Sequence, residues 1–341
     1  MPALSAIGGR VTVWARRALL VVLVVCAARP GHAQRRGTVE TDDFESAALG
    51  VRKRYLIYLP PSYGTDVLRR YPVAYYLHGA WGNEGDWVQR GGIDVVMDSL
   101  IAAGMPEMVV VMPDGDDGWY TSWEPAYRWR VCPSRTDLRE PAAAYCVRKP
   151  RYDRYVAEDL VRHVDATYRT EADARHRGVA GLSMGGYGAM ALASQYPGVW
   201  SAAASHSGVI SLLATAVDTA AGTVEYATHP DTLRGRWPAL WRLLAPVFGP
   251  RLADWQSRDP ARRLARVKAD ARARLPALYI DAGTGDSAYV LNSRAFRVEL
   301  NRLGMPFEYH EYPGGHDWRY WRAHVGQSLA WLAGRIAPQA P

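Results

Sequence analysis

One serine lies in a sequence setting that few folds provide. An apolar run from Gly178 to Gly181 ends in Gly181-Leu182-Ser183-Met184-Gly185, and a helical pattern of small residues follows directly. A strand that turns straight into a helix crowds the backbone, and glycines on both sides of the serine relieve that crowding because they carry no Cβ. The turn pushes the hydroxyl out of the sheet. Ser183 is therefore the predicted nucleophile of an α/β protein.

The rest of the chain alternates strand-like and helix-like segments, which favours a mostly parallel central sheet with helices on both faces. The expected strands are 52–59, 71–77, 108–112, 178–181, 201–207, 277–281 and 307–312. The expected helices are 93–103, 155–168, 293–303 and 321–336.

Residues 208–275 break this alternation. They are rich in Trp and Arg and mostly helical in pattern, which predicts a helical insertion at about 209–275, before the loop with the candidate acid. Two interpretations stay open: a cap beside the active site, or a peripheral helical layer. No linker or repeat divides the middle of the chain, so residues 34–341 are expected to form a single domain.

The first 33 residues have the pattern of an export signal. Three arginines precede the apolar run Ala18 to Ala28, and small residues follow at Gly31 and Ala33. Cleavage there predicts a secreted or periplasmic protein without stable membrane insertion. The alternative is a permanent anchor, but Arg29 and Pro30 interrupt a run already shorter than the ~20 residues a membrane helix needs.

The charge of the chain points to no particular macromolecular partner. The formal net charge is +7, but residues 1–33 carry four arginines and no acid; removing these four from 41 leaves 37 basic residues against 34 acidic ones. Basic clusters such as Arg262-Arg263 alternate with apolar residues at helical spacing, as on a solvated helix face. We expect no nucleic-acid partner.

Export would leave two cysteines, Cys132 and Cys146, in an oxidising compartment. One disulfide between them is expected, and two buried free thiols are the alternative. Neither cysteine lies in the paired Cys/His spacing of a zinc site. We expect neither a metal nor a cofactor.

Ser183 needs a base, and that base needs a carboxylate that fixes its tautomer. His316 follows a strand-like run in a glycine-rich turn late in the chain, whereas His78, His206 and His310 are expected to be structural. Asp286 lies in the glycine-rich loop after the strand 277–281 and can reach His316. Asp281, still on that strand, is the alternative acid and is expected to make a structural hydrogen bond.

An ester-cleaving site also needs N–H donors for the developing oxyanion. In this kind of fold one comes from the residue after the nucleophile, here Met184, and one from the loop after the third strand. That loop is residues 77–82, where Ala80 is the expected donor and Trp81 the alternative. The alternative is that residues 77–82 are an ordinary glycine-rich connection without a catalytic role.

Tryptophan and tyrosine total 33 residues against four phenylalanines, and many fall in expected substrate loops. Rings with a polar edge stack on sugars or aryl groups, although packing beneath long loops uses them too. The candidate substrate residues are Trp81, Trp119, Trp123 and Trp318. A second cluster of Asp114, Asp116 and Asp117 could suggest calcium, but close acids on a glycine-rich turn are usually solvated or cap a helix.

Five segments together resemble the esterase D family of α/β-hydrolases, over about residues 52–333. They are Leu77-His78-Gly79-Ala80, Met112-Pro113-Asp114-Gly115, residues 181–186, Gly283-Thr284-Gly285-Asp286 and residues 314–321. This family includes S-formylglutathione hydrolases, feruloyl and acetyl-xylan esterases, enterochelin esterases and the antigen 85 mycolyltransferases. The resemblance implies an α/β-hydrolase fold with Ser183 as nucleophile, Asp286 as acid and His316 as base.

Residues 119–123 and 315–321 look most like the mycolyltransferase branch, from which the loop 132–146 departs. The expected function is a serine carboxylic-ester hydrolase acting through an acyl-enzyme on a small-molecule or polysaccharide-linked ester, such as a carbohydrate or aryl ester. Acyl transfer of the mycolyltransferase type is one alternative. A catalytically silent binding module on the same fold is an alternative of another class.

Overall fold

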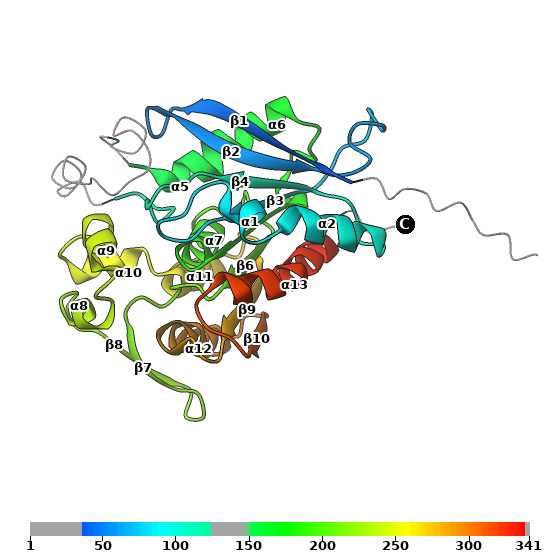
Figure 1. Ribbon diagram of the computed structural model, residues 1–341. Coiled ribbons are helices and arrows are strands. Elements are labelled where there is room, and N and C mark those ends of the chain that lie inside the picture. Colours follow the sequence, from blue (N-terminus) through cyan, green and yellow to red (C-terminus); the bar gives the residue numbers. More distant parts are fainter. Residues whose placement is uncertain (1–35, 124–146, 148–149, 338–341) are drawn as a thin grey trace, which may run out of the picture. The chain divides into compact units, whose positions relative to one another are not determined.

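The computed structural model describes residues 36–123, 147 and 150–337 (Figure 1). The expected signal segment 1–33 and both cysteines of the expected disulfide, Cys132 and Cys146, lie outside these residues. Among the helices that are described, none is both long and apolar enough to cross a bilayer.

Eight strands form the central sheet, in the order β1-β2-β4-β3-β5-β6-β9-β10. Their bounds are β1 Thr38–Ser46, β2 Val51–Leu59, β3 Val73–Leu77, β4 Val109–Pro113, β5 Arg177–Leu182, β6 Ala202–His206, β9 Ala277–Gly283 and β10 Glu308–Tyr312. All neighbours from β4 to β10 pair in parallel, so the predicted mostly parallel sheet is confirmed.

The first edge of the sheet differs from the regular parallel pattern. β1 was not predicted and pairs antiparallel with β2; the predicted strand 52–59 is β2, and it pairs antiparallel with β4. β2 runs opposite to β3 and β4 because residues 60–72, which connect β2 to β3, contain no helix. A parallel crossover between two strands usually needs one. β1 itself was missed because TVETDDFES has a mostly solvent-facing, polar composition without an apolar run.

Thirteen helical segments are described. They are α1 Asp86–Gln89, α2 Ile93–Ala102, α5 Tyr152–Arg154, the π-helical η3 Tyr155–Leu160, α6 Val161–Thr167, η4 Ala174–His176, α7 Met184–Gln195, α8 Thr232–Arg236, α9 Trp241–Phe248, α10 Leu252–Ser257, α11 Pro260–Ala269, α12 Ser287–Arg302 and α13 Trp318–Ile336. The predicted helices 93–103, 155–168, 293–303 and 321–336 correspond to α2, the continuous α5-η3-α6, α12 and α13.

The helices cover both faces of the sheet because strand side chains alternate between two cores. In β3, Val73, Tyr75 and Leu77 join the core formed with α6, α7 and α12, whereas Ala74 and Tyr76 face α1, α2 and α13. α2 and α13 lie side by side on the second face (Figure 1). The central strands, which lie between the two helical layers, are buried on both faces, as expected for parallel strands.

The segment 208–275 is not purely helical. It contains α8 to α11 but also a two-stranded antiparallel sheet of β7 Ala214–Asp218 and β8 Thr223–Tyr226. α11 packs on α7, and β7 packs on α12. Leu233 and Leu244 of its helices are fully buried in the first core.

Candidate active site

The candidate site lies at the carboxyl ends of four parallel strands, where ligands of open α/β sheets commonly bind. Ser183 follows β5, the loop with Ala80 follows β3, Asp286 follows β9, and His316 follows β10. Their side chains are far apart in sequence and are brought together by the strand order β3-β5-β6-β9-β10.

Ser183 has the strained backbone that its sequence setting predicts. Its φ and ψ are 53° and −114°, between the end of β5 and the start of α7. A Cβ on Gly181 would lie 2.4 Å from the carbonyl carbon of Gly185, and one on Gly185 would lie 2.3 Å from the carbonyl oxygen of Leu77. Both glycines are therefore required for the turn that presents the serine.

Ser183, His316 and Asp286 form one hydrogen-bonded series. His316 Nε2 lies 2.9 Å from Ser183 Oγ, and His316 Nδ1 lies 2.8 Å from Asp286 Oδ2. The Asp286 side chain is almost fully buried, whereas that of His316 is about one quarter exposed. An imidazole held at Nδ1 by a carboxylate presents Nε2 as a proton acceptor towards the serine.

The alternative acid, Asp281, has different neighbours. Its Oδ2 lies 2.7 Å from Nδ1 of His206, and its Oδ1 accepts a hydrogen bond from the Tyr320 hydroxyl at 2.9 Å. His206 Nε2 in turn lies 2.8 Å from the hydroxyl oxygen of Ser328. Asp281 and His206 are fully buried and belong to this polar network between the sheet and α13.

The other two histidines expected to be structural, His78 and His310, contact residues other than Ser183 and Asp286. His78 is buried; its Nε2 accepts the N–H of Gly115, and its Nδ1 lies 2.8 Å from the carbonyl oxygen of Gly79. His310 on β10 contacts Glu308 at 2.9 Å.

The loop after β3 lies beside Ser183 and lines the same cavity. The N–H of Trp81 is taken by Asp117 Oδ1 at 2.7 Å, and Trp81 has a left-handed φ of 62°. The N–H groups of Ala80 and Met184 find no acceptor among the residues that the structure describes. This pattern favours Ala80 over Trp81 as the second donor.

A cavity of about 340 Å³ opens beside Ser183 and His316. Of the candidate substrate tryptophans, Trp81 and Trp318 line it, and the Trp81 side chain is largely exposed. Trp119 and Trp123 do not. Trp119 is fully buried against Tyr187 and Phe248, and Trp123 packs on Tyr152, so neither supports the expected substrate contact in this cavity.

Further residues line this cavity that the sequence alone did not single out. Among them are Asp86, Arg90, Leu240, Tyr289 and Trp321. Tyr289 could have been found, because it follows Asp286 by three residues in a helical pattern and so shares its side of the helix. Leu240 belongs to the segment 208–275, and the sequence of this segment does not indicate which of its residues face the active site.

The acidic cluster near β4 is occupied by a cation of the chain itself. The buried Lys53 ammonium contacts Asp114 and lies 2.8 Å from Asp116 Oδ1. Burial alone would lower the pKa of Lys53, but Asp116 and Asp114 raise it overall. Burial and repulsion from Asp114 together raise the pKa of Asp116. The oxygens that could suggest calcium thus bind Lys53 and, through Asp117, the loop at Trp81.

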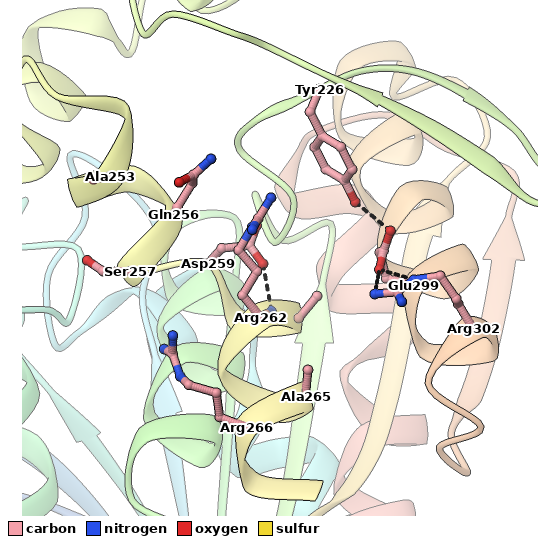
Figure 2. A pocket seen from close by; sticks show the side chains of 11 residues that line it. Tyr226, Ala253, Gln256, Ser257, Asp259, Arg262, Ala265, Arg266, Glu299 and Arg302 are labelled. Atoms are coloured by element: carbon pink, nitrogen blue, oxygen red, sulfur yellow. Dashed lines mark hydrogen bonds and ion pairs between the residues drawn. The ribbon is translucent and has the colours of Figure 1, made fainter. Parts of the chain in front are cut away.

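A second and larger cavity, of about 620 Å³, lies among α10, α11 and α12 (Figure 2). Its acids are engaged: Asp259 accepts the backbone N–H of Arg262 at 3.0 Å, and Glu299 accepts bonds from Tyr226 and Arg302. No histidine is among its lining residues. The Ser-His-Asp arrangement beside Ser183 is therefore not repeated among these lining residues.

The geometry beside Ser183 agrees with what comparison with known proteins finds. The Esterase family model, described as "Putative esterase", matches residues 46–332. The chain belongs to this family. The resemblance inferred from the five sequence segments is thereby confirmed.

Relatives and solved structures agree with this membership. The chain is 30% identical over 290 residues to "Esterase Rv1288" of Mycobacterium tuberculosis, covering 81% of this chain and 55% of that protein. The chain thus spans about half the length of this relative. It is also 30% identical over 155 residues to an "Endo-1,4-beta-xylanase/feruloyl esterase" of Xylanibacter ruminicola, covering 44% of this chain and 19% of that protein.

Two solved structures show the same fold. A ferulic acid esterase superposes with a TM-score of 0.63 at 24% identity, covering 89% of this chain and 99% of that chain. MPT51 (FbpC1) of Mycobacterium tuberculosis superposes with a TM-score of 0.62 at 20% identity, covering 88% and 99%. The α/β-hydrolase fold implied by the resemblance is confirmed.

Proposed function

We propose that this chain hydrolyses carboxylic esters through an acyl-enzyme formed on Ser183. The observation that carries the proposal is the continuous series Ser183 Oγ, His316 and Asp286, with contacts of 2.9 and 2.8 Å, beside an open cavity. Membership of the Esterase family supports the same reaction class.

In the acylation step, His316 Nε2 takes the proton of the Ser183 hydroxyl while Oγ attacks the ester carbonyl carbon. The carbonyl oxygen becomes an oxyanion, for which Ala80 and Met184 supply N–H donors. When the tetrahedral intermediate collapses, the bond to the alcohol oxygen breaks and His316 returns the proton to the leaving alcohol. Asp286 accepts the hydrogen bond from Nδ1 and stabilises the imidazolium.

In the deacylation step, a water molecule takes the place of the alcohol. His316 accepts one proton of that water as its oxygen attacks the acyl carbon, and the second collapse returns the proton to Ser183 Oγ. The products are a carboxylic acid and the free enzyme. An alcohol in place of water would give acyl transfer by the same residues.

The lining of the cavity supports an ester with an aryl or carbohydrate part. Trp81 and Trp318 line the same cavity as Ser183, and rings with a polar edge stack on such groups. A related chain is named a ferulic acid esterase, which fits this substrate class. Turnover of methyl ferulate, acetylated sugars and p-nitrophenyl acetate, each with and without a sugar acceptor, separates hydrolysis from acyl transfer.

The decisive experiment replaces the nucleophile. Ser183→Ala should abolish turnover of p-nitrophenyl acetate and labelling by a fluorophosphonate, with an unchanged circular dichroism spectrum, because the serine forms the covalent bond and buries little surface. Ser257→Ala, which alters a serine of the larger cavity, is the matched control and should retain both. Labelling of Ser183→Ala at another residue contradicts the proposal. A wild-type protein without turnover or labelling indicates a catalytically silent binding module.

A further inference from the structure

The ring of His316 is held on two sides by aromatic side chains. Tyr289 stacks on it with ring centroids 3.5 Å apart and planes inclined by 16°. Trp321 meets it nearly at a right angle, with centroids 4.9 Å apart. Tyr289 is itself backed by Trp237 of the segment 208–275, at 5.3 Å.

One helical turn supplies both the carboxylate and the stacked ring. Asp286 is the residue before α12, and the N–H of Tyr289 donates to the carbonyl oxygen of Asp286 at 3.0 Å. Side chains three residues apart lie on the same side of a helix. Asp286 therefore reaches the Nδ1 edge of His316 while Tyr289 covers the face of the same ring.

We propose that Tyr289 is a positioning residue for His316, which fixes the plane of the imidazole and stabilises the imidazolium formed during ester cleavage. The inference rests on the proposed ester chemistry. The carboxylate contact at Nδ1 leaves the ring free to tilt about that bond, whereas a face-to-face stack restricts the tilt and keeps Nε2 towards Ser183. An aromatic face also attracts a cation whose centre lies within about 6 Å.

The charged neighbours of His316 come from several elements. Asp286 contacts Nδ1, and Asp317, Asp86 and Arg90 line the same cavity. Burial and the nearby Asp286 raise the pKa of Tyr289 to about 12, so its phenol is neutral at neutral pH and acts through the ring rather than as a charge. None of these charges changes in the variants below.

Two substitutions separate the ring from the hydroxyl. Tyr289→Leu removes the aromatic face but keeps an apolar side chain, and Tyr289→Phe keeps the face and removes only the hydroxyl. Tyr312→Leu is the matched control, because Tyr312 stacks on His324 with centroids 4.3 Å apart and touches none of the proposed catalytic residues. The measurement is the pH profile of kcat/KM with p-nitrophenyl acetate.

Tyr289→Leu should move the acid limb of the profile to lower pH by about 0.5 to 1 unit and lower the plateau about three- to tenfold. Tyr289→Phe and Tyr312→Leu should keep the wild-type profile. An unchanged acid limb in Tyr289→Leu overturns the proposal, as does an equal shift in Tyr289→Phe. Tyr289→Met, a flexible side chain of similar volume, replaces the leucine variant if that protein does not fold.

A second readout keeps this test separate from the proposed function. The NMR titration of the His316 ring, assigned by its loss in His316→Gln, needs no turnover. Its midpoint should fall in Tyr289→Leu and stay unchanged in Tyr289→Phe. If the wild-type protein cleaves no ester but the midpoint moves in this way, ester cleavage is wrong and the Tyr289 contact still stands; if the midpoint does not move, the Tyr289 proposal fails by itself.

Discussion

Asp281 and Asp286 are five positions apart in the chain but have opposite surroundings. Asp281 lies on β9 and contributes to a buried polar network with His206 and Tyr320. Asp286 lies in the loop beyond the strand, where it contacts His316 at the edge of the cavity. A strand residue points above or below the sheet, whereas a residue in the following loop can reach across the strand ends.

Substitution of Asp286 should therefore affect catalysis, whereas substitution of Asp281 should affect stability. Asp286→Asn should lower kcat roughly 10⁴-fold with little change in KM or unfolding free energy, because the imidazole loses the partner that holds its tautomer. Asp281→Asn should instead lower the unfolding free energy by about 2–4 kcal/mol, since it breaks a buried pair. Steady-state kinetics and urea unfolding of both variants measure this. The assignment is reversed if Asp281→Asn alone loses kcat while the fold is unchanged.

Individual site residues could be predicted from the sequence where the local backbone limits the direction of the side chain. Ser183 on its turn, and Asp286 and His316 in glycine-rich loops after strands, could be singled out and are found in hydrogen-bond contact. The tryptophans could not be sorted in the same way. A loop has no period, so nothing in the sequence distinguishes Trp318, which lines the cavity, from Trp119, which packs into the core.

Among the elements, α11 begins at a buried acid beside the larger cavity. Asp259 precedes the helix and accepts the N–H of Arg262, as Figure 2 shows. Burial is the main reason that the pKa of Asp259 is raised to about 6, although this backbone hydrogen bond opposes the rise. The folded state therefore binds this proton more tightly than the unfolded chain does.

The raised pKa of Asp259 makes the free energy of unfolding depend on pH between about pH 4 and pH 6. Because the folded state holds the proton up to about pH 6 and the unfolded chain releases it near pH 4, the stabilisation is complete below pH 4 and is lost as the pH rises to 6. Asp259→Asn, which caps the helix equally well without a charge, should lack this loss. At pH 7.5 the variant should exceed the wild type in unfolding free energy by about 2–3 kcal/mol more than it does at pH 4. Equal differences in urea unfolding at the two pH values would contradict the burial of a charge there.

Elements with a clear hydrophobic period were predictable, and those without one were not. The ends of α13 agree with the pattern to within three residues, because buried apolar positions recur along this helix. The ends of β10 agree to within one residue, although all five of its residues are only partly buried. β1 has no apolar run, and β7 and β8 lie in a segment where helical patterns dominate. Their pairing is decided by neighbouring strands, which a local pattern does not contain.

For the molecule as a whole, the class of the sheet followed from the sequence but the strand order did not. β4 lies between β2 and β3, so a strand later in the chain separates two earlier ones. Alternating apolar segments predict parallel pairing with helices on both faces, yet many strand orders satisfy that description. The side chains that fill the two cores select among them.

Export is a prediction that depends on residues outside the described ones. The mature protein should begin near Gln34, because small residues precede that position after an apolar run. It should show no free thiol when denatured without reductant, since only Cys132 and Cys146 would remain. N-terminal sequencing of the protein from its native host and thiol titration measure both. Two reactive thiols would exclude the disulfide, and an intact residue 1 would exclude cleavage.

The contact between Ser183 and His316 joins residues 133 positions apart, and the loop that carries His316 leaves β10, which is one of the two edge strands of the sheet. A chain in which every other strand has paired still lacks the base beside its serine. Capture of Ser183 by a fluorophosphonate during refolding therefore records the moment at which that edge strand docks. The rate of this labelling would measure how fast the non-local pairing of β10 forms, and non-local pairing is the slow part of building such a sheet.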